Sequence, residues 1–459
     1  MFKITLIGIA PKNVYTELID VFLRPDEYVC IGDGETDERP DAEYAHRLSF
    51  NGSDYANQRN QIKRQMYRLL SELTGKTPEW GILTGIRPVK VAGELIKKEG
   101  SREKARQLLV GYFFLSLGKA EQVLDMFEHQ NRLVGEAKKN SAGIYIGIPF
   151  CPSRCLYCSF TSNQGTEAQI QDYLDALHKE IEYTGLEMSA LNMYPESVYL
   201  GGGTPTSISA SQLDALLCKI ENTFDLKDCV EITVEAGRPD TITKEKLAII
   251  KQHNINRISI NPQSMKDATL ALIGRNHSAE DIRNAFSLAR TAGIEIINAD
   301  IIAGLPGETP QDFQDTLNQV IGLGAENITV HTLAVKRASR LKDLDSQFHH
   351  KQEVAVVEML KISELLLDAS GYRPYYLYRQ KHMAGGLENV GYCKGDTDGI
   401  YNMRIMDEHQ TIIALGAGGI TKVYFPDEDR LERVPNVSNF EIYVERIEEM
   451  INRKREHLF

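Results

Sequence analysis

Short apolar runs of strand length alternate with amphipathic helical patterns through the middle of the chain. Between these runs, apolar residues recur at the three- and four-residue spacing of a helix, over 169–187, 209–222, 244–252, 279–292 and 310–323. Tandem strand–helix units predict an α/β fold, a parallel sheet curled into a partial (β/α)6 barrel with its function at the carboxyl ends of the strands. The apolar runs cover 143–148, 196–200, 230–236, 255–260, 294–300 and 327–332.

The pattern differs on either side of this region. Before it, alternating runs at 2–8 and 27–34 surround a short helical stretch, and longer helical patterns follow at 55–74 and 92–135. After it, a helical pattern over Gln352–Ser370 leads into aromatic and basic residues and a terminal helix. We therefore expect three domains: an N-terminal α+β accessory domain (1–140), the barrel core (141–345) and a C-terminal domain that closes the barrel mouth (346–459).

Composition excludes several classes of partner. The 459 residues are 42% hydrophobic and 25% charged, as in ordinary globular proteins. The net charge of -12 argues against nucleic acid and anionic lipid as partners, and no apolar run is long enough to insert into a membrane. Seven irregularly placed cysteines do not form a disulfide framework, so we expect a reducing, cytoplasmic compartment. We also expect a monomer.

The strongest chemical signal is a loop with three cysteines, Cys151, Cys155 and Cys158, directly after the first barrel strand. Three thiolates this close can hold one [4Fe–4S] cluster and leave its fourth iron open to a small molecule. Zinc is the competing use, but a structural zinc site needs four ligands, and the next cysteines, Cys218 and Cys229, lie far along the chain. The spacing therefore favours the cluster.

Polar and glycine residues recur where the predicted strands end. The second strand runs into Gly201–Gly203, whose backbone a ligand can approach closely. Glu235 ends the third strand, Gln263 follows the fourth and Asp300 ends the fifth. Each alone is typical of a turn or a helix cap, but on one rim they indicate a pocket for a polar cofactor.

Several stretches together resemble one enzyme family, the radical S-adenosylmethionine (SAM) enzymes of the oxygen-independent coproporphyrinogen III oxidase group. They are YIGIPFCPSRCLYCSF, YLGGGTPT, LIGRNHS and NADIIAGLPGETPQDF. Three later stretches look most like the HemZ branch of that group, namely HTLAVKRASRL, YYLYRQKHMAGGLENVGY and ALGAGGITK. The resemblance covers about 141–425 and leaves out the first 140 residues.

The resemblance implies the site residues position by position. The cluster ligands would be Cys151, Cys155 and Cys158. A first SAM would lie against Tyr145, Gly202, Glu235 and Ile420. Positions that contact a second SAM in the family match Tyr157, Gly203, Thr204, Gln263, Arg275, Asp300 and Ala334, and the sequence leaves open whether that second molecule binds. The residues expected to act in catalysis are Tyr145, Glu235 and Arg337.

The activity that the resemblance implies is oxidative decarboxylation of two propionates of coproporphyrinogen III, which gives protoporphyrinogen IX in haem biosynthesis without oxygen. The cluster and SAM would supply the radical, and an electron donor and an acceptor, both unidentified, would complete the reaction. A tetra-anionic substrate requires a basic pocket. Candidates for this pocket are Lys336, Arg337, Arg340, Arg373, Arg379 and Lys381.

The chain departs from the oxidase pattern at two positions. Phe160 stands where characterised oxidases have a further cysteine, and Gly147 where they have a histidine. A haem chaperone branch is the alternative reading, but its H-N-x-x-Y-W motif is replaced by residues 388–393, ENVGYC, and glutamate is a poor substitute for a haem-ligating histidine. A methyltransferase or haem-opening enzyme on the same core is a third alternative.

Overall fold

Two compact units make up the structure, a computed structural model that describes residues 2–5, 13–24, 26–31, 55–85, 87–159, 162–334, 339–341, 348, 352–380 and 387–459. Unit 1 contains residues 1–129, 345–354 and 377–389, and unit 2 contains the remainder. The three-domain division expected from the sequence stays a prediction. Among the described helices, none is both long and apolar enough to cross a bilayer.

Unit 1 has a short parallel strand pair and a group of helices. Strand β1 (Phe2–Thr5) pairs with β2 (Tyr28–Ile31), and α1 (Asn13–Ile19) lies between them in sequence. The 92–135 pattern is not one helix, because Gly100 adopts a left-handed conformation (φ 64°) and Ser101 caps the next helix. The helices are α2 (Tyr55–Thr74), α3 (Pro88–Glu99), α4 (Arg102–Gly111) and α5 (Leu117–Leu133).

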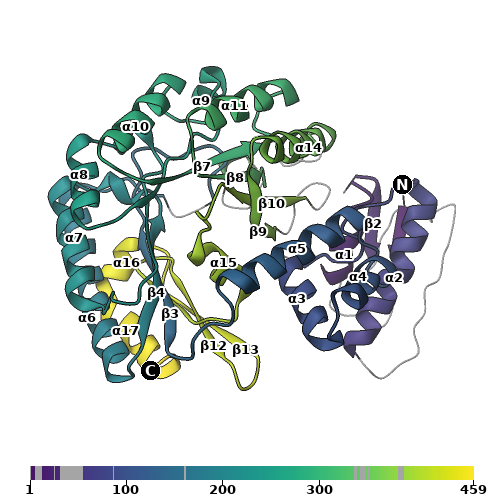
Figure 1. Cartoon of the computed structure of the whole chain (residues 1–459), viewed down its shortest axis with the longest axis horizontal. Helices are drawn as coiled ribbons and strands as arrows, with labels where there is room; N and C mark the ends of the chain where they lie inside the picture. Colours follow the sequence, from purple (N-terminus) through teal and green to yellow (C-terminus); the bar gives the residue numbers. More distant parts are fainter. Residues whose placement is uncertain are drawn as a thin grey trace. The chain divides into compact units, whose positions relative to one another are not determined.

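Unit 2 is built on a parallel sheet whose strands follow one another in chain order (Figure 1). Neighbouring strands pair in parallel throughout this part of the sheet. Among the described strands the sheet does not close on itself, so the predicted partial barrel is confirmed. Its strands are β3 (Ser141–Ile148), β4 (Tyr194–Gly202), β5 (Glu231–Glu235), β6 (Arg257–Ser259), β7 (Ile296–Ala303) and β8 (Asn327–Thr332).

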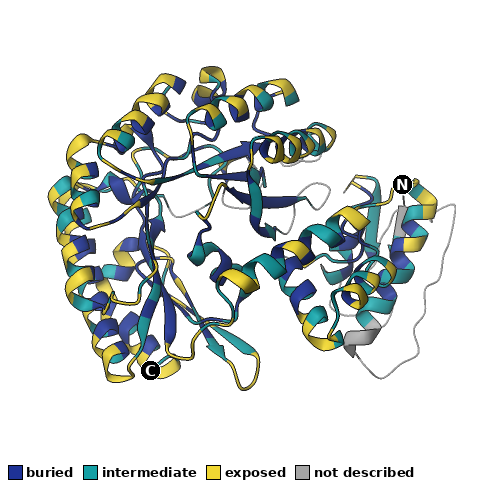
Figure 2. Cartoon of the chain, viewed as in Figure 1, coloured by how far each residue is buried: buried dark blue, intermediate teal, exposed yellow. Residues whose placement is uncertain are grey.

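Helices follow the strands and cover the outer face of the sheet, with their buried sides toward the strands (Figure 2). Four of them begin with a capping box, in which Thr166, Ser209, Ser278 or Thr309 accepts a backbone hydrogen bond. The predicted helices are all present, and one short helix, α9 (Asp267–Leu272), is additional. The others are α6 (Glu167–Ala190), α7 (Ala210–Thr223), α8 (Lys244–Gln252), α10 (Ala279–Thr291) and α11 (Pro310–Gly322).

The C-terminal segment extends both edges of this sheet. After α14 (Glu353–Ala369), strands β9 (Arg373–Arg379) and β10 (Glu388–Cys393) continue it beyond β8, where β10 runs antiparallel. At the other edge β11 (Ile412–Leu415) pairs in parallel with β3. The remaining elements are α15 (Ile400–Asp407), β12 (Ile420–Phe425), β13 (Arg430–Pro435), α16 (Phe440–Glu445) and α17 (Ile447–His457).

A buried ion pair fastens the last helices to the barrel. The Glu180 carboxylate on α6 accepts hydrogen bonds from Lys454 Nζ on α17 at 2.5 Å and from Tyr443 Oη on α16 at 2.5 Å. It also accepts from the side chain of Asn436 and from the backbone N–H of Gly416. Both ions are buried, with side-chain exposures of 0% for Glu180 and 1% for Lys454. Removing either charge would leave the other buried and unpaired.

Substituting Glu180→Gln should therefore destabilise unit 2 by about 3 kcal/mol, because the Lys454 ammonium keeps only a neutral partner. The urea midpoint of unfolding, followed by circular dichroism, measures this loss. Glu182→Gln is the matched control on the same helix, since its pair with Lys219 is exposed to solvent. Equal midpoints for the two variants would contradict the interpretation.

Candidate functional site

The cysteine loop leaves the carboxyl end of β3 and is held by backbone hydrogen bonds at both of its ends. The backbone N–H of Cys151 donates to the Asn163 carbonyl at 2.9 Å, and that of Cys158 to the Cys155 carbonyl at 3.3 Å. Between them, Leu156 N–H donates to the Ile273 carbonyl after α9. The loop is thus positioned before any ligand binds.

The glycine run after β4 packs directly on this loop. Gly203 N–H donates to the Ile148 carbonyl, and Thr204 N–H to the Phe150 carbonyl, both at 2.8 Å. A Cβ added to Gly203 would lie 2.6 Å from that Phe150 oxygen and 3.0 Å from Cys151 Sγ, so only glycine fits here. Thr204 Oγ1 lies 3.4 Å from the same sulfur.

The buried position of the Cys151 thiol disfavours its thiolate form. Burial raises its pKa to about 11, the hydroxyl of Thr204 acts in the opposite direction, and the neighbouring thiols of Cys158 and Cys155 add to the rise. Binding a metal centre to these sulfurs would therefore release protons.

Arg238 is a site residue that the sequence analysis missed. Its guanidinium is buried, and Nη1 lies 3.7 Å from Cys155 Sγ while Nη2 donates to Ser153 Oγ at 3.1 Å. Asp240 accepts from the same guanidinium at 3.1 Å and orients it. The signal in the sequence was its position three residues after Glu235, which ends a strand that the sequence already predicted to contribute to the pocket. A cation here stabilises negative charge on the cysteine sulfurs.

A second group of polar residues lies beside the loop. Arg275 donates from Nη1 to the Asn261 carbonyl at 2.6 Å and from Nη2 to Tyr157 Oη at 3.3 Å. Gln263 has a left-handed backbone (φ 65°), and its N–H donates to the carbonyl of Asp300. Three buried polar atoms of this group, Gln263 Oε1, Asn261 Oδ1 and Arg275 Nε, have no partner among the described residues. Such atoms are typical of a site built for a polar ligand.

Tyrosine rings and a carboxylate line the interior beside the glycine run. Tyr145 on β3 and Tyr199 on β4 are register partners, with ring centroids 6.3 Å apart. Tyr401 from α15 stacks on Tyr199 at 4.6 Å. A Cβ on Gly201 would lie 2.9 Å from the Tyr199 ring, 3.2 Å from Tyr145 and 3.3 Å from the Glu235 carboxyl, so the glycine lets these three side chains pack closely against the backbone.

The pKa values of the two carboxyl groups on this rim are shifted in opposite directions. Burial raises the pKa of Glu235 to about 7, the Tyr199 hydroxyl that donates to it at 2.5 Å acts in the opposite direction, and the nearby Asp300 adds to the rise. Burial also acts to raise the pKa of Asp300, but interactions with His331 and Asn298 outweigh it and lower the value. Asp300 is thus anionic near neutral pH, and Glu235 is poised to gain or lose a proton.

The remaining predicted positions lie on the same strand ends or outside the described residues. Gly202 has φ 111°, and Ala334 follows the end of β8. Ile420 begins β12, and its side chain is 49% exposed. Arg337 lies outside the described residues, as do Lys336, Lys381 and Phe160.

Two of the basic candidates have partners within the fold. Arg373 Nη2 pairs with Asp398 at 2.7 Å in unit 2. In unit 1 the Arg379 guanidinium lies over the Trp80 ring at 5.1 Å and donates to the Leu83 carbonyl. Arg340 is exposed. The basic pocket for the substrate therefore stays a prediction.

The residues at the carboxyl strand ends fit a cluster and a polar cofactor. Three cysteine side chains provide a soft donor set, and the cation of Arg238 lies against it. Unpartnered buried polar atoms lie on the same rim.

Comparison with known proteins agrees with this geometry. Residues 145–320 match the model of the Radical SAM superfamily. The oxygen-independent coproporphyrinogen-III oxidase-like protein HemZ of Bacillus subtilis (strain 168) is 40% identical over 411 residues, which cover 87% of this chain and 81% of the relative. The chain belongs to the HemZ family of radical SAM proteins. Membership of the superfamily implies a [4Fe–4S] cluster and SAM.

Other relatives of this HemZ-family chain are more distant. The heme chaperone HemW of Bacillus subtilis (strain 168) is 33% identical over 234 residues, 50% of this chain and 61% of the relative. The solved structure of coproporphyrinogen III oxidase (HemN) from Escherichia coli superposes with a TM-score of 0.56 at 22% identity, over 70% of this chain and 72% of that one. The latter similarity establishes the shared fold.

Replacing Cys155 by alanine should abolish the visible absorbance of the reconstituted cluster, because the other two thiols cannot hold it alone. Iron and sulfide content measured with the spectrum checks this. Cys229→Ala is the matched control, since that thiol precedes β5 and should leave the chromophore unchanged. A retained chromophore in Cys155→Ala would refute the ligand assignment.

The affinity for SAM should rise with pH between about pH 6 and about pH 8. A pKa of about 7 means that Glu235 gains its negative charge over this range, and the SAM sulfonium is a cation that the carboxylate attracts. We expect up to about a tenfold gain in affinity, measured by calorimetry on the cluster-loaded protein. In Glu235→Gln the gain should disappear; an identical pH profile in that variant would exclude Glu235 as its source.

Proposed function

We propose that this HemZ-family protein catalyses the SAM-dependent, oxygen-independent decarboxylation of coproporphyrinogen III to protoporphyrinogen IX. The observation that carries the proposal is the loop of Cys151, Cys155 and Cys158 at the carboxyl ends of parallel strands, beside unpartnered buried polar atoms. This is the arrangement that a cluster-bound polar cofactor requires.

In this proposal the three cysteines hold a [4Fe–4S] cluster, and SAM binds beside it. When bound and reduced, these groups would supply the radical chemistry that removes a hydrogen atom from the β-carbon of a propionate, and loss of one more electron and of CO2 would leave a vinyl group. The first SAM would lie against Tyr145, Gly202, Glu235 and Ile420. A second would lie against Tyr157, Gly203, Thr204, Gln263, Arg275, Asp300 and Ala334.

The protein's own groups would orient the cofactor and exclude water. Glu235 would offer a carboxylate to the sulfonium, and the backbone of the glycine run would lie against the amino-acid part of SAM. The stack of Tyr145, Tyr199 and Tyr401 supplies an apolar wall. Arg337 is proposed to bind a substrate propionate, because a guanidinium matches a carboxylate in a bidentate geometry.

Haem delivery is the second candidate function, since HemW chaperones are relatives. The position that would carry the haem-binding histidine is Glu388, and this side chain is buried within unit 1. It accepts a hydrogen bond from Trp80 Nε1 at 2.8 Å and pairs with Lys119 Nζ at 2.5 Å. A glutamate carboxylate that is already bound to these two side chains does not ligate haem iron. This favours the enzymatic function over haem delivery.

The seven cysteines are too few and too irregularly placed for a disulfide framework, which supports a reducing compartment, and we propose the cytoplasm. The reaction also requires a one-electron donor and a terminal electron acceptor.

Anaerobic incubation of the cluster-loaded protein with reductant, SAM and coproporphyrinogen III tests the proposed function. Porphyrin products and 5′-deoxyadenosine are quantified together, with Cys155→Ala as the inactive control. We expect protoporphyrinogen with stoichiometric deoxyadenosine in the wild type and neither in the variant.

The other outcomes distinguish the alternatives. Deoxyadenosine without decarboxylated product would retain the radical chemistry and reject this substrate. No deoxyadenosine from an intact cluster, together with haem bound in a defined ratio, would favour the chaperone and overturn the proposal.

A further inference from the structure

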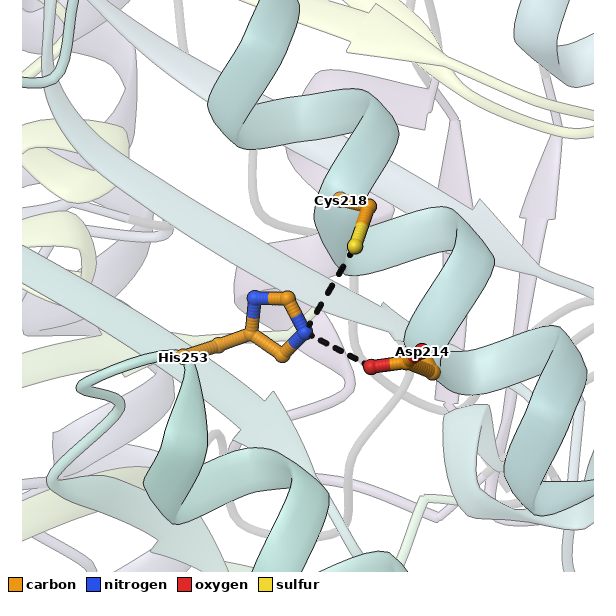
Figure 3. A group of neighbouring side chains, drawn as sticks. All are labelled: Asp214, Cys218 and His253. Carbon is orange, nitrogen blue, oxygen red and sulfur yellow. Dashed lines mark hydrogen bonds and ion pairs between the residues drawn. The ribbon is translucent and has the colours of Figure 1, made fainter.

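A second group of side chains, of residue types that bind metals in proteins, lies on the outer helices, apart from the cysteine loop. Asp214 and Cys218 are one turn apart on α7, and His253 caps the end of α8. Figure 3 shows the imidazole directed toward both side chains across the gap between the two helices. His253 Nε2 lies 3.0 Å from Asp214 Oδ1 and 4.0 Å from Cys218 Sγ.

These three atoms already have the spacing of ligands around one ion. All of them lie within 4.8 Å of one another. A cation placed among them would need only small side-chain movements to reach bonding distances of about 2.0–2.3 Å. His253 is the buried member, at 7% exposure, and Cys218 is exposed, so the group opens to solvent on one side.

The other ring nitrogen of His253 supplies a separate observation. Nδ1 lies 2.9 Å from Glu221 Oε2, which is on the same face of α7 as Asp214 and Cys218. A carboxylate that accepts the Nδ1 hydrogen fixes the tautomer and turns the lone pair of Nε2 toward the other two side chains. This is the outer-shell arrangement found behind histidines that bind metals.

We propose that Asp214, Cys218 and His253 form a divalent-cation site of the zinc type, with Glu221 as its positioning residue. A thiolate, an imidazole and a carboxylate are ligands that zinc takes together, and water would occupy the open fourth position. Magnesium and calcium prefer all-oxygen sites, so they are excluded by the sulfur and nitrogen. The site joins the helices that follow β4 and β5.

Without the ion, the same residues form an ordinary ion-pair cluster. Burial acts to lower the pKa of His253, but hydrogen bonds with Asp214 and Glu221 outweigh it and raise the pKa. Zinc would therefore displace the proton from Nε2 and another from the Cys218 thiol. The two states differ in whether the Cys218 sulfur bonds to a metal, which a spectrum can detect.

Cobalt(II) is the probe, because it replaces zinc and gives charge-transfer absorbance only when bound to a thiolate. The full chain with Cys151, Cys155 and Cys158 replaced by alanine is titrated anaerobically, so that the cluster thiols do not compete. We expect one equivalent of cobalt to bind with a thiolate band, and zinc to displace it.

Matched variants in the same background decide the assignment. Cys218→Ser should remove the thiolate band, while Cys229→Ser should keep it. Glu221→Gln should keep the band and weaken affinity about ten- to hundredfold, as expected of a residue that orients a ligand. No saturable thiolate band, or a band that survives in Cys218→Ser, would overturn the proposal.

A second measurement covers the case in which the triple variant fails to fold. The cluster-loaded full chain, with Cys151, Cys155 and Cys158 intact, is titrated with zinc by calorimetry and compared with its Cys218→Ser and His253→Gln variants. Loss of one binding event in both variants supports the site. Equal zinc stoichiometry in all three proteins refutes it.

Discussion

The carboxylate of Glu180 accepts hydrogen bonds from four donors of the C-terminal segment, and the attachment of β11 to the sheet depends on it. Lys454 and Tyr443 bring α17 and α16 against α6, while Gly416 N–H and Asn436 fix the turn between β11 and β12. That turn packs on β3, since a Cβ on Gly416 would lie 2.5 Å from the Gly147 carbonyl. One buried charge thus determines how β11 meets the strand that leads to the cysteine loop.

The site combines residues from the ends of several strands. The contacts that join them lie mostly in loops and turns and not in regular helices or strands. Backbone hydrogen bonds join the cysteine loop to the glycine run and to the turn after α9. Arg238 and Arg275 then bring two buried cations to the loop, near Cys155 and Tyr157. The rim consequently combines soft sulfur donors with fixed positive charge, an environment that suits an anionic metal cluster.

The strand–helix repeat was predictable because each apolar run and each capping serine or threonine acts locally. The three cysteines were predictable for the same reason, since their spacing is itself local. The break at Gly100–Ser101 has a local signal, a glycine followed by a serine, but the helical periodicity on both sides of it conceals that signal. The aromatic and basic residues after Ser370 supply three of the candidates for the basic pocket, and the segment Arg373–Arg379 among them forms strand β9.

Contacts between distant residues could not be predicted in this way. The stacking of Tyr401 on Tyr199 and the approach of Arg238 to Cys155 arise from how separate elements pack, and no short pattern encodes them. Glu388 is similar: the sequence showed that a histidine was missing, and only the fold showed the glutamate bound to Trp80. Local patterns locate a site, and tertiary packing sets its electrostatics.

Strand β3 lies in the sheet between β4, its successor in the chain, and β11, which is far away in sequence. The nearby hydrogen bond from Gln410 to Ser141 spans 269 residues. During synthesis at about 5–20 residues per second, this edge of the barrel therefore stays unpaired for about 10 seconds or longer after β3 has emerged. Throughout that time the nascent chain exposes an apolar, two-sided strand that carries the cysteine loop, which makes it a natural substrate for chaperones and sensitive to C-terminal truncation.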